Sequence, residues 1–528
     1  MAPRPEPESE RLKTIPRIAV ATLSGALALG TLTVAVARPH APPSPVPSAS
    51  PSGSPAPLPT ATPEPASVAI PRLEAKIKAN PNDQPSLAEL AGYYLASNQP
   101  QQAAALTQRL LALGNKTAQV YFLDGSAKEM LGKGKEATAD FEQAADREPT
   151  NAQVLLTLTD LYLRENRPAD AERIAKRATT FNATDPRVFE NYGLVLAQEQ
   201  KFDDARTQFE AAAKLAPKDA TPLVLEARTY ITQKALALAV TDFDRALAID
   251  PKNPDALLGK ARVLAAQHDV KGAIAAYEQL YAIVPSDDAK VAVLVEEYQV
   301  YRDAKQNDDA LAVLKRGEAT FPKIAAMHIA YGDYDVAIAK DIPAGEAQWK
   351  TALGPNRDVP DALTRLGELS LQRKNMPEAL GYFKRLTEVQ PNDPNTWATL
   401  AQVDAQAGRF QDAHDAFRHS FEIAHTPQTL AGVGTSDLQI KNYKECIAVF
   451  DAIDKNATPF LKANPQLYYV YGKCAAADGN KAKARLAFAK LKPFVKPNTP
   501  LAKQLDADIR AVAAAPARAS KPSAPKPH

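Results

Sequence analysis

Three histidines and a glycine–lysine run are the residues of this chain whose spacing comes nearest to metal or phosphate chemistry. His414, His419 and His425 follow one another in steps of five and six. Helical metal ligands need steps of three or four, so these side chains should point to diverging faces. The run Gly132-Lys133-Gly134-Lys135 lacks the earlier glycine of a phosphate-binding loop, and we expect a turn there. We therefore predict no metal site, no cofactor and no catalytic residues.

The elements that carry these residues follow from an alanine that returns every 34 residues. The strict series is Ala103, Ala137, Ala171, Ala205, Ala239 and Ala273. With small slips it continues through Ala310, Gly345, Ala379, Ala413, Cys446 and Ala484. In most strict copies an aromatic residue follows four residues later and a proline twelve residues later. A fixed period of this size predicts one supersecondary unit copied in series. The units start near residues 84, 118, 152, 186, 220, 254, 291, 325, 360, 394, 427 and 465.

Each unit carries two apolar runs with helical spacing, separated by a short polar turn. Steps of three and four residues place the apolar side chains on one face of each helix. Prolines such as Pro251 and Pro254 mark helix ends, because proline is tolerated in the first turn and not in the interior. Small residues, such as Gly193 on a first helix and the periodic alanine on a second, should let the two helices approach closely. We expect the periodic aromatic to fill the wider space toward the next pair.

The units resemble the tetratricopeptide repeat over roughly residues 84–498. The best matches are Phe189, Tyr192, Gly193, Ala205, Phe209, Ala212 and Pro217, and Trp397, Leu400, Ala401, Ala413 and Phe417. Thr159 and Val295 depart from the family's small first-helix residue, and Asn115, Ala183 and His425 depart from its terminal proline. The resemblance implies an all-α, right-handed superhelical solenoid of about twelve helix-turn-helix repeats. A leading helix over 68–83 and a capping helix over 499–512 should cover the two open ends of the array.

The two cysteines, Cys446 and Cys474, fall in neighbouring units. Cys446 occupies the position of the periodic alanine, and we interpret it first as a small core residue. The resemblance implies that the elements carrying the two cysteines pack together, which leaves a disulfide open. An oxidising compartment would permit that bond.

The N-terminal region predicts a membrane anchor. Residues 18–37 are uncharged and mainly apolar, and 20 residues of helix span about 30 Å, the thickness of a bilayer core. Basic residues precede this stretch, so the positive-inside rule places residues 1–17 in the cytoplasm and the repeats outside it, in the periplasm or at the cell exterior. The sequence Ala35-Val36-Ala37 also offers a cleavage site, and a cleaved signal peptide is the alternative.

Two further segments have compositions that predict disorder. Residues 38–67 are rich in Pro, Ser and Ala, and residues 513–528 form a Pro/Ala-rich basic tail. Such segments bury too little apolar surface to offset the entropy lost on ordering. The formal net charge of the chain is only +2, which gives no overall attraction to nucleic acid.

The resemblance also implies where a ligand would lie, because the family binds proteins or extended peptides on a concave face formed by first helices. The candidate groove residues are Asn191, Arg228, Arg262, Arg302, Arg365 and Glu368. Arg228 and Arg262 share one phase in neighbouring units and could form a guanidinium pair for a carboxylate. A solvated polar wall is the alternative interpretation of the same residues.

These features together predict a membrane-tethered, extracytoplasmic scaffold without catalytic activity. It would bind proteins or peptides through the groove, would be held to the membrane through residues 18–37, and would assemble or recruit envelope partners. Two alternatives stay open. The chain could be a secreted binding protein released by signal cleavage, or a regulatory subunit of an envelope enzyme complex.

Overall fold

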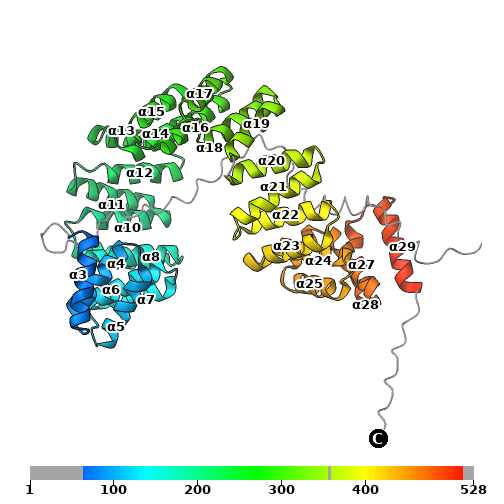
Figure 1. Ribbon diagram of the computed structural model, residues 1–528, viewed down its shortest axis with the longest axis horizontal. Helices are drawn as coiled ribbons and strands as arrows, with labels where there is room; N and C mark the ends of the chain where they lie inside the picture. Colours follow the sequence, from blue (N-terminus) through cyan, green and yellow to red (C-terminus); the bar gives the residue numbers. More distant parts are fainter. Residues whose placement is uncertain (1–63, 355–357, 515–528) are drawn as a thin grey trace, which may run out of the picture. The chain divides into compact units, whose positions relative to one another are not determined.

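The computed structural model describes residues 64–354 and 358–514, which are helical with short turns and contain no strand (Figure 1). They divide into two compact units, one of residues 64–316 and one of residues 317–354 and 358–514. None of the helices in these ranges has the length and apolarity needed to cross a bilayer. The predicted segments 1–17 and 18–37, most of 38–67, and the tail beyond residue 514 lie outside the described residues.

Twelve helix pairs follow one another along the described residues, and the all-helical repeat architecture is confirmed. The first helices are α4 (Gln84–Ala96), α6 (Ala118–Met130), α8 (Ala152–Arg164), α10 (Pro186–Gln198), α12 (Thr221–Thr232), α14 (Pro254–Ala266), α16 (Asp287–Asp303), α18 (Ala325–Tyr334), α20 (Pro360–Gln372), α22 (Pro394–Gln406), α24 (Pro427–Gln439) and α27 (Gln466–Asp478). The second helices are α5 (Pro100–Ala112), α7 (Gly134–Arg147), α9 (Pro168–Phe181), α11 (Phe202–Leu215), α13 (Leu236–Ile249), α15 (Val270–Ile283), α17 (Asn307–Thr320), α19 (Ile342–Leu353), α21 (Met376–Val389), α23 (Phe410–Ile423), α25 (Tyr443–Asn456) and α28 (Lys481–Leu491).

Local sequence fixes where these helices begin and turn. Asn151 and Asn253 cap α8 and α14, each accepting a hydrogen bond from a backbone N–H of the first turn, at 3.2 and 2.9 Å. The connection inside each pair places one residue in the left-handed region, where Asn and Gly are favoured. Six of these residues are spaced 34 apart, namely Asn98, Gly132, Asn166, Gln200, Lys234 and His268. Gly132 and Lys133 thus lie in a helix-to-helix turn, as expected, whereas Gly134 and Lys135 are the first two residues of α7.

Packing within each pair depends on the periodic small residues. The alanines of the 34-residue series are fully buried, and so is Cys446 at the same phase. Gly193 lies so close to the ring of Phe209 that an added Cβ would be 2.5 Å from a ring carbon. The aromatic side chain therefore packs against the small residue of its own repeat. It can also make the expected contact with the next helix pair. Gly259 shows that second contact, since it lies against Phe243 of the preceding repeat.

The slips in the period correspond to local irregularities. Helix α16 begins at Asp287, one turn before the expected start at 291. A π-turn, η1 (Asp335–Ala339), follows α18, and a short extra helix, α26 (Thr458–Ala463), separates α25 from α27. These are the segments where the spacing between periodic small residues departs from 34.

An additional helix packs on each end of the described array. Helix α3 (Ala66–Ala79) buries Leu73 against α4, in the region of the leading helix expected over 68–83. Helix α29 (Pro500–Ala514), joined to α28 through the short η2 (Lys492–Phe494), buries Leu505 and packs on α28, where we expected a capping helix over 499–512.

Candidate protein-binding surface

Polar side chains link successive first helices in the unit of residues 64–316. Asn191 of α10 donates a hydrogen bond from Nδ2 to Oδ1 of Asp160 on α8, at 2.8 Å. Burial raises the pKa of the Asp160 carboxyl to about 6, although the bond from Asn191 opposes this. The other amide atom of Asn191, Oδ1, is buried and has no hydrogen-bond partner in the described residues. Asn191 is thus held in place by the preceding repeat and keeps an unused acceptor.

Arg228 and Arg262 each form an ion pair with a carboxylate of the following repeat. The Nη2 atom of Arg228 on α12 lies 2.9 Å from Oδ1 of Asp255 at the start of α14. Arg262 on α14 lies 2.6 Å from Oε1 of Glu296 on α16. The hydroxyl of Tyr277 also donates to Glu296, at 3.0 Å. The carboxylate of Glu296 therefore accepts hydrogen bonds from both Arg262 and Tyr277.

Three of these polar contacts join first helices in series, and we call them the first-helix ladder: Asp160–Asn191, Arg228–Asp255 and Arg262–Glu296. The ladder gives the two predicted arginines separate carboxylate partners. A ligand carboxylate would therefore have to add to these ion pairs or displace Asp255 and Glu296.

In the unit of residues 317–354 and 358–514, a contact of the same kind joins α18 to α20. Arg365 of α20 binds Asp333 of α18 through both carboxylate oxygens, with Nη2 to Oδ2 at 2.7 Å. The indole of Trp349 donates to the same carboxylate at 3.1 Å. This bidentate, partly buried pair fixes Arg365 firmly.

The last two predicted groove residues have different surroundings. Arg302, in the last turn of α16, pairs with its neighbour Asp303 at 2.9 Å. Glu368 is exposed on α20, one helical turn beyond Arg365. All six predicted residues thus lie on first helices. Within residues 64–316, Asn191, Arg228, Arg262 and Arg302 each have a separate partner.

Sequence reasoning missed Asp255 and Asp333, the partners of Arg228 and Arg365. A signal for them exists in the spacing, because each carboxylate stands about one repeat away from its arginine, at separations of 27 and 32 residues. Arg228 and Arg262 reach different levels of the following first helix. Arg262 pairs with Glu296 near the middle of α16, whereas Arg228 pairs with Asp255 at the start of α14.

Two hollows among the described residues differ greatly in size: one of about 580 Å³ lies between α21 and the end of α22, beside Met376, Leu380 and Gln406. A cavity of about 20 Å³ lies between α11 and α12, beside Phe209, Glu226 and Tyr230. That volume holds about one water molecule. No group of three or more metal-ligating side chains occurs in the described ranges, and His414, His419 and His425 do not form one.

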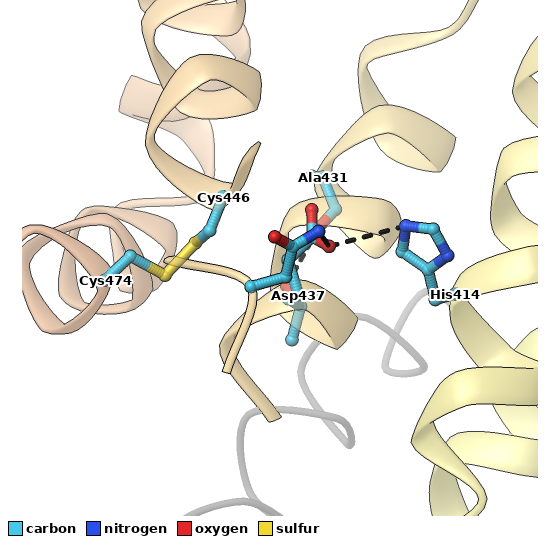
Figure 2. Close-up of a disulfide and its surroundings, with 7 residues drawn as sticks. His414, Ala431, Asp437, Cys446 and Cys474 are labelled. Carbon is cyan, nitrogen blue, oxygen red and sulfur yellow. Dashed lines mark hydrogen bonds and ion pairs between the residues drawn. A yellow bond between two sulfur atoms is a disulfide. The ribbon is translucent and has the colours of Figure 1, made fainter. Parts of the chain in front are cut away.

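The cysteines form a disulfide, which corrects our first interpretation of Cys446 as core alone. Cys446 of α25 and Cys474 of α27 are bonded across a Cα–Cα distance of 6.2 Å, and both are fully buried (Figure 2). Figure 2 also shows His414 of α23 directed at Asp437 of α24, with Nε2 at 3.4 Å from the carboxylate. Burial raises the pKa of the Asp437 carboxyl, against the opposing effects of His414 and Asn442.

Two family models match the sequence. Residues 91–301 match the family described as Tetratricopeptide repeat protein 21 N-terminal ARM repeat, and residues 339–394 match the family described as Tetratricopeptide repeat. Among curated proteins, none matches the chain in sequence.

Several solved structures are similar to parts of the chain. YrrB, described as a TPR protein with an unusual peptide-binding site, is 25% identical over 35% of this chain and 95% of its own, with a TM-score of 0.30. Pseudomonas aeruginosa pilF is 17% identical over 40% of this chain and 94% of its own, with a TM-score of 0.31. Yeast Tom70 is 14% identical over 75% of this chain and 94% of its own, with a TM-score of 0.39. With TM-scores this low, the three similarities carry no argument about function.

Proposed function

We propose, from the premise that this chain is a tetratricopeptide-repeat protein, that it is a non-catalytic scaffold binding proteins or extended peptides along its first helices. The observation that supports this most is the first-helix ladder. Its polar groups recur at three junctions between successive first helices, which suits an extended ligand, and the cavity between α11 and α12 holds about one water molecule. Repeat arrays use such surfaces because each unit adds one more contact to a long partner.

The ladder suits a partner with acidic groups. Arg262 leaves 57% of its side chain exposed while it is paired with Glu296. A guanidinium has five N–H donors, and the pair with Glu296 engages only Nε and Nη2. A partner carboxylate can therefore add to Arg262 without first breaking the existing pair.

We further propose that the scaffold is tethered to a membrane through residues 18–37 and acts on the extracytoplasmic side. The apolar length of that segment and the basic residues before it support the tether. The Cys446–Cys474 disulfide favours an oxidising compartment. Tethering would raise the effective concentration of the array toward partners in the same envelope. A secreted, cleaved form and a regulatory subunit of an envelope enzyme complex are the alternatives.

Crosslinking in intact cells, followed by identification of captured proteins, tests the binding surface. We expect the double variant Arg228→Glu plus Arg262→Glu to reduce the amount of captured partner at least about tenfold. Removing one member of a charge pair at an interface weakens binding by this much or more. The matched control is Arg173→Glu plus Arg206→Glu. These two arginines are also exposed and ion-paired, but they lie on the second helices α9 and α11. Equal capture by both double variants and the parent chain would contradict the proposal.

Membrane fractionation and N-terminal sequencing test the tether. The full-length chain should sediment with membranes and resist extraction by high salt. A mature protein that starts at Arg38 would replace the anchor with the cleaved alternative. Recovery of the full-length chain from the soluble cytoplasm would contradict both forms.

A further inference from the structure

Charge is distributed very unevenly along this nearly neutral chain. Residues 481–528 hold eleven Lys and Arg against two Asp, a net charge of +9. Because the whole chain carries +2, the preceding 480 residues carry −7. A basic C-terminal region on an otherwise acidic protein points to a separate interaction with an anionic partner.

The structure shows which of these cations are available. Lys483 of α28 pairs with Asp451, and Lys490 pairs with Asp454 at 2.6 Å, so both are held by α25. Arg485, Lys492 and Lys496 are exposed, and none of them forms an ion pair within the described residues. The available cations are therefore Arg485 in the middle of α28, Lys492 and Lys496 in the short segment that follows it, and Lys503 and Arg510, which are exposed on α29.

Apolar side chains are exposed at the same place. Leu486 of α28 is 54% exposed and Phe494 of η2 is 51% exposed. The buried face of α28 is complete without Leu486, because Ala484, Ala487, Phe488 and Leu491 form it.

Helical spacing arranges these groups in a definite order around α28. Ala482, Leu486, Ala489 and Pro493 recur in steps of three and four and are all exposed, so they form an apolar stripe on the solvent side. Arg485 and Lys492 flank the stripe on one side, and Lys483 and Lys490 flank it on the other. Phe494 and Lys496 extend the same surface beyond the helix.

We propose that this basic–apolar edge, defined as Arg485, Leu486, Lys492, Phe494 and Lys496, docks on the surface of an anionic lipid bilayer. A central apolar stripe between cationic flanks is the arrangement by which helices lie in a membrane interface. The apolar side chains enter the boundary between headgroups and acyl chains, while lysine and arginine contact lipid phosphates. The phosphates of a nucleic acid would neutralise the same cations but would leave Leu486 exposed to water. This proposal depends neither on the first-helix ladder nor on residues 18–37.

Site-specific fluorescence in the full chain tests the proposal separately from any insertion of residues 18–37. A Phe494→Trp variant is mixed with phosphatidylglycerol vesicles that contain brominated phosphatidylcholine, a short-range quencher. The matched control is Leu238→Trp on α13, because Leu238 is 50% exposed and lies on a second helix that is distant in sequence from residue 494. The signal of the native Trp349 and Trp397 is subtracted using the parent chain. We expect quenching of the tryptophan at 494 and little or none at 238.

Charge reversal then tests the electrostatic part. Arg485→Glu, Lys492→Glu and Lys496→Glu are combined in the Phe494→Trp chain. The lipid concentration needed for half-maximal quenching should rise about tenfold or more, since each cation near an anionic surface strengthens binding severalfold. Arg485→Lys should keep it, and unchanged helical circular dichroism shows that the variants fold. Vesicles of phosphatidylcholine alone should give little quenching at 494.

Two results would overturn the proposal. One is equal quenching at positions 494 and 238 in the anionic vesicles. The other is charge-dependent binding of a single-stranded RNA without quenching at 494 by lipid, which would make the edge a nucleic-acid site. Failure here leaves the crosslinking test of the first-helix ladder unaffected, because the two surfaces share no residue.

Discussion

Gly193 of α10 lies against the ring of Phe209 of α11 so closely that residue size alone decides whether these helices can pack. Replacing Gly193 by Val would place Cβ 2.5 Å from the buried ring, with two further carbons beyond it. We expect a loss of about 1–3 kcal/mol in local stability, because overpacking forces side chains and backbone to shift. Native-state hydrogen exchange of α10 and α11 measures this loss.

The matched control for Gly193 is Gly92 in the interior of α4, where an added Cβ would meet no atom within 4 Å. Gly92→Val should change the stability of its own repeat by no more than about 0.5 kcal/mol, as surface substitutions usually do. Equal destabilisation by the two valines would mean that helix propensity, and not the contact with Phe209, determines the effect.

Glu226 of α12 makes the stability of its repeat depend on pH. Its side chain is buried, and burial together with the nearby charge of Asp242 raises its pKa to about 7. The folded pKa lies above the unfolded value of 4.5, so the fold favours the neutral acid. Stability from this group is complete below the unfolded pKa and is lost as pH rises through about 7.

Glu226→Gln keeps the shape of the side chain and removes the charge. The variant should match the parent chain near pH 4 and exceed its stability at pH 8, by about 3 kcal/mol if each pKa unit corresponds to about 1.4 kcal/mol. Hydrogen exchange of α12 and α13 at the two pH values measures the difference. Glu388→Gln, at an exposed position of α21, is the control for replacing a glutamate on the surface. A constant advantage of the Glu226→Gln variant at both pH values would contradict the role of ionisation.

At the scale of elements, the helices were the most predictable part of the molecule. The expected starts at 152, 186 and 254 coincide with the first residues of α8, α10 and α14. These boundaries depend on local signals, namely caps, prolines and apolar spacing, which act within a few residues. The periodic small residues were also predictable, because each one packs against the other helix of its own pair, to which it is joined by a single short turn.

The irregular elements and the pairing of polar groups could not be predicted in the same way. The π-turn η1 and the helix α26 appeared in the sequence only as slips of the period. The candidate residues Asn191 and Arg262 were found singly, but their partners depend on how far one repeat is rotated and shifted against the next. Arg228 shows the problem, since its partner is Asp255 at the start of α14, whereas Arg262 pairs with Glu296 near the middle of α16. The disulfide likewise depends on geometry between repeats, which a period does not specify.

At the scale of the whole molecule, each repeat contacts mainly its neighbours. The stability of one repeat therefore depends on the repeats next to it more than on distant ones. Apolar side chains form a series of clusters along the chain, each made by a few successive helices. The last cluster, over Ala431 to Val512, holds both cysteines. A change there should therefore affect nearby repeats first and leave distant ones unchanged.

Removal of the disulfide tests this local character. Cys446→Ala plus Cys474→Ala opens a cross-link between residues separated by 28 positions, and chain entropy predicts a loss of about 3–4 kcal/mol. Alanine is the residue that most repeats carry at the phase of Cys446, so little of the loss should come from a cavity. Hydrogen exchange should accelerate in α25, α27 and α28, while α8 to α11 keep their protection. Chemical reduction of the parent chain should reproduce the pattern, because it breaks the same bond without changing a residue. Protection lost equally in α8 to α11 would mean that the array unfolds as one cooperative body and that the nearest-neighbour description is wrong.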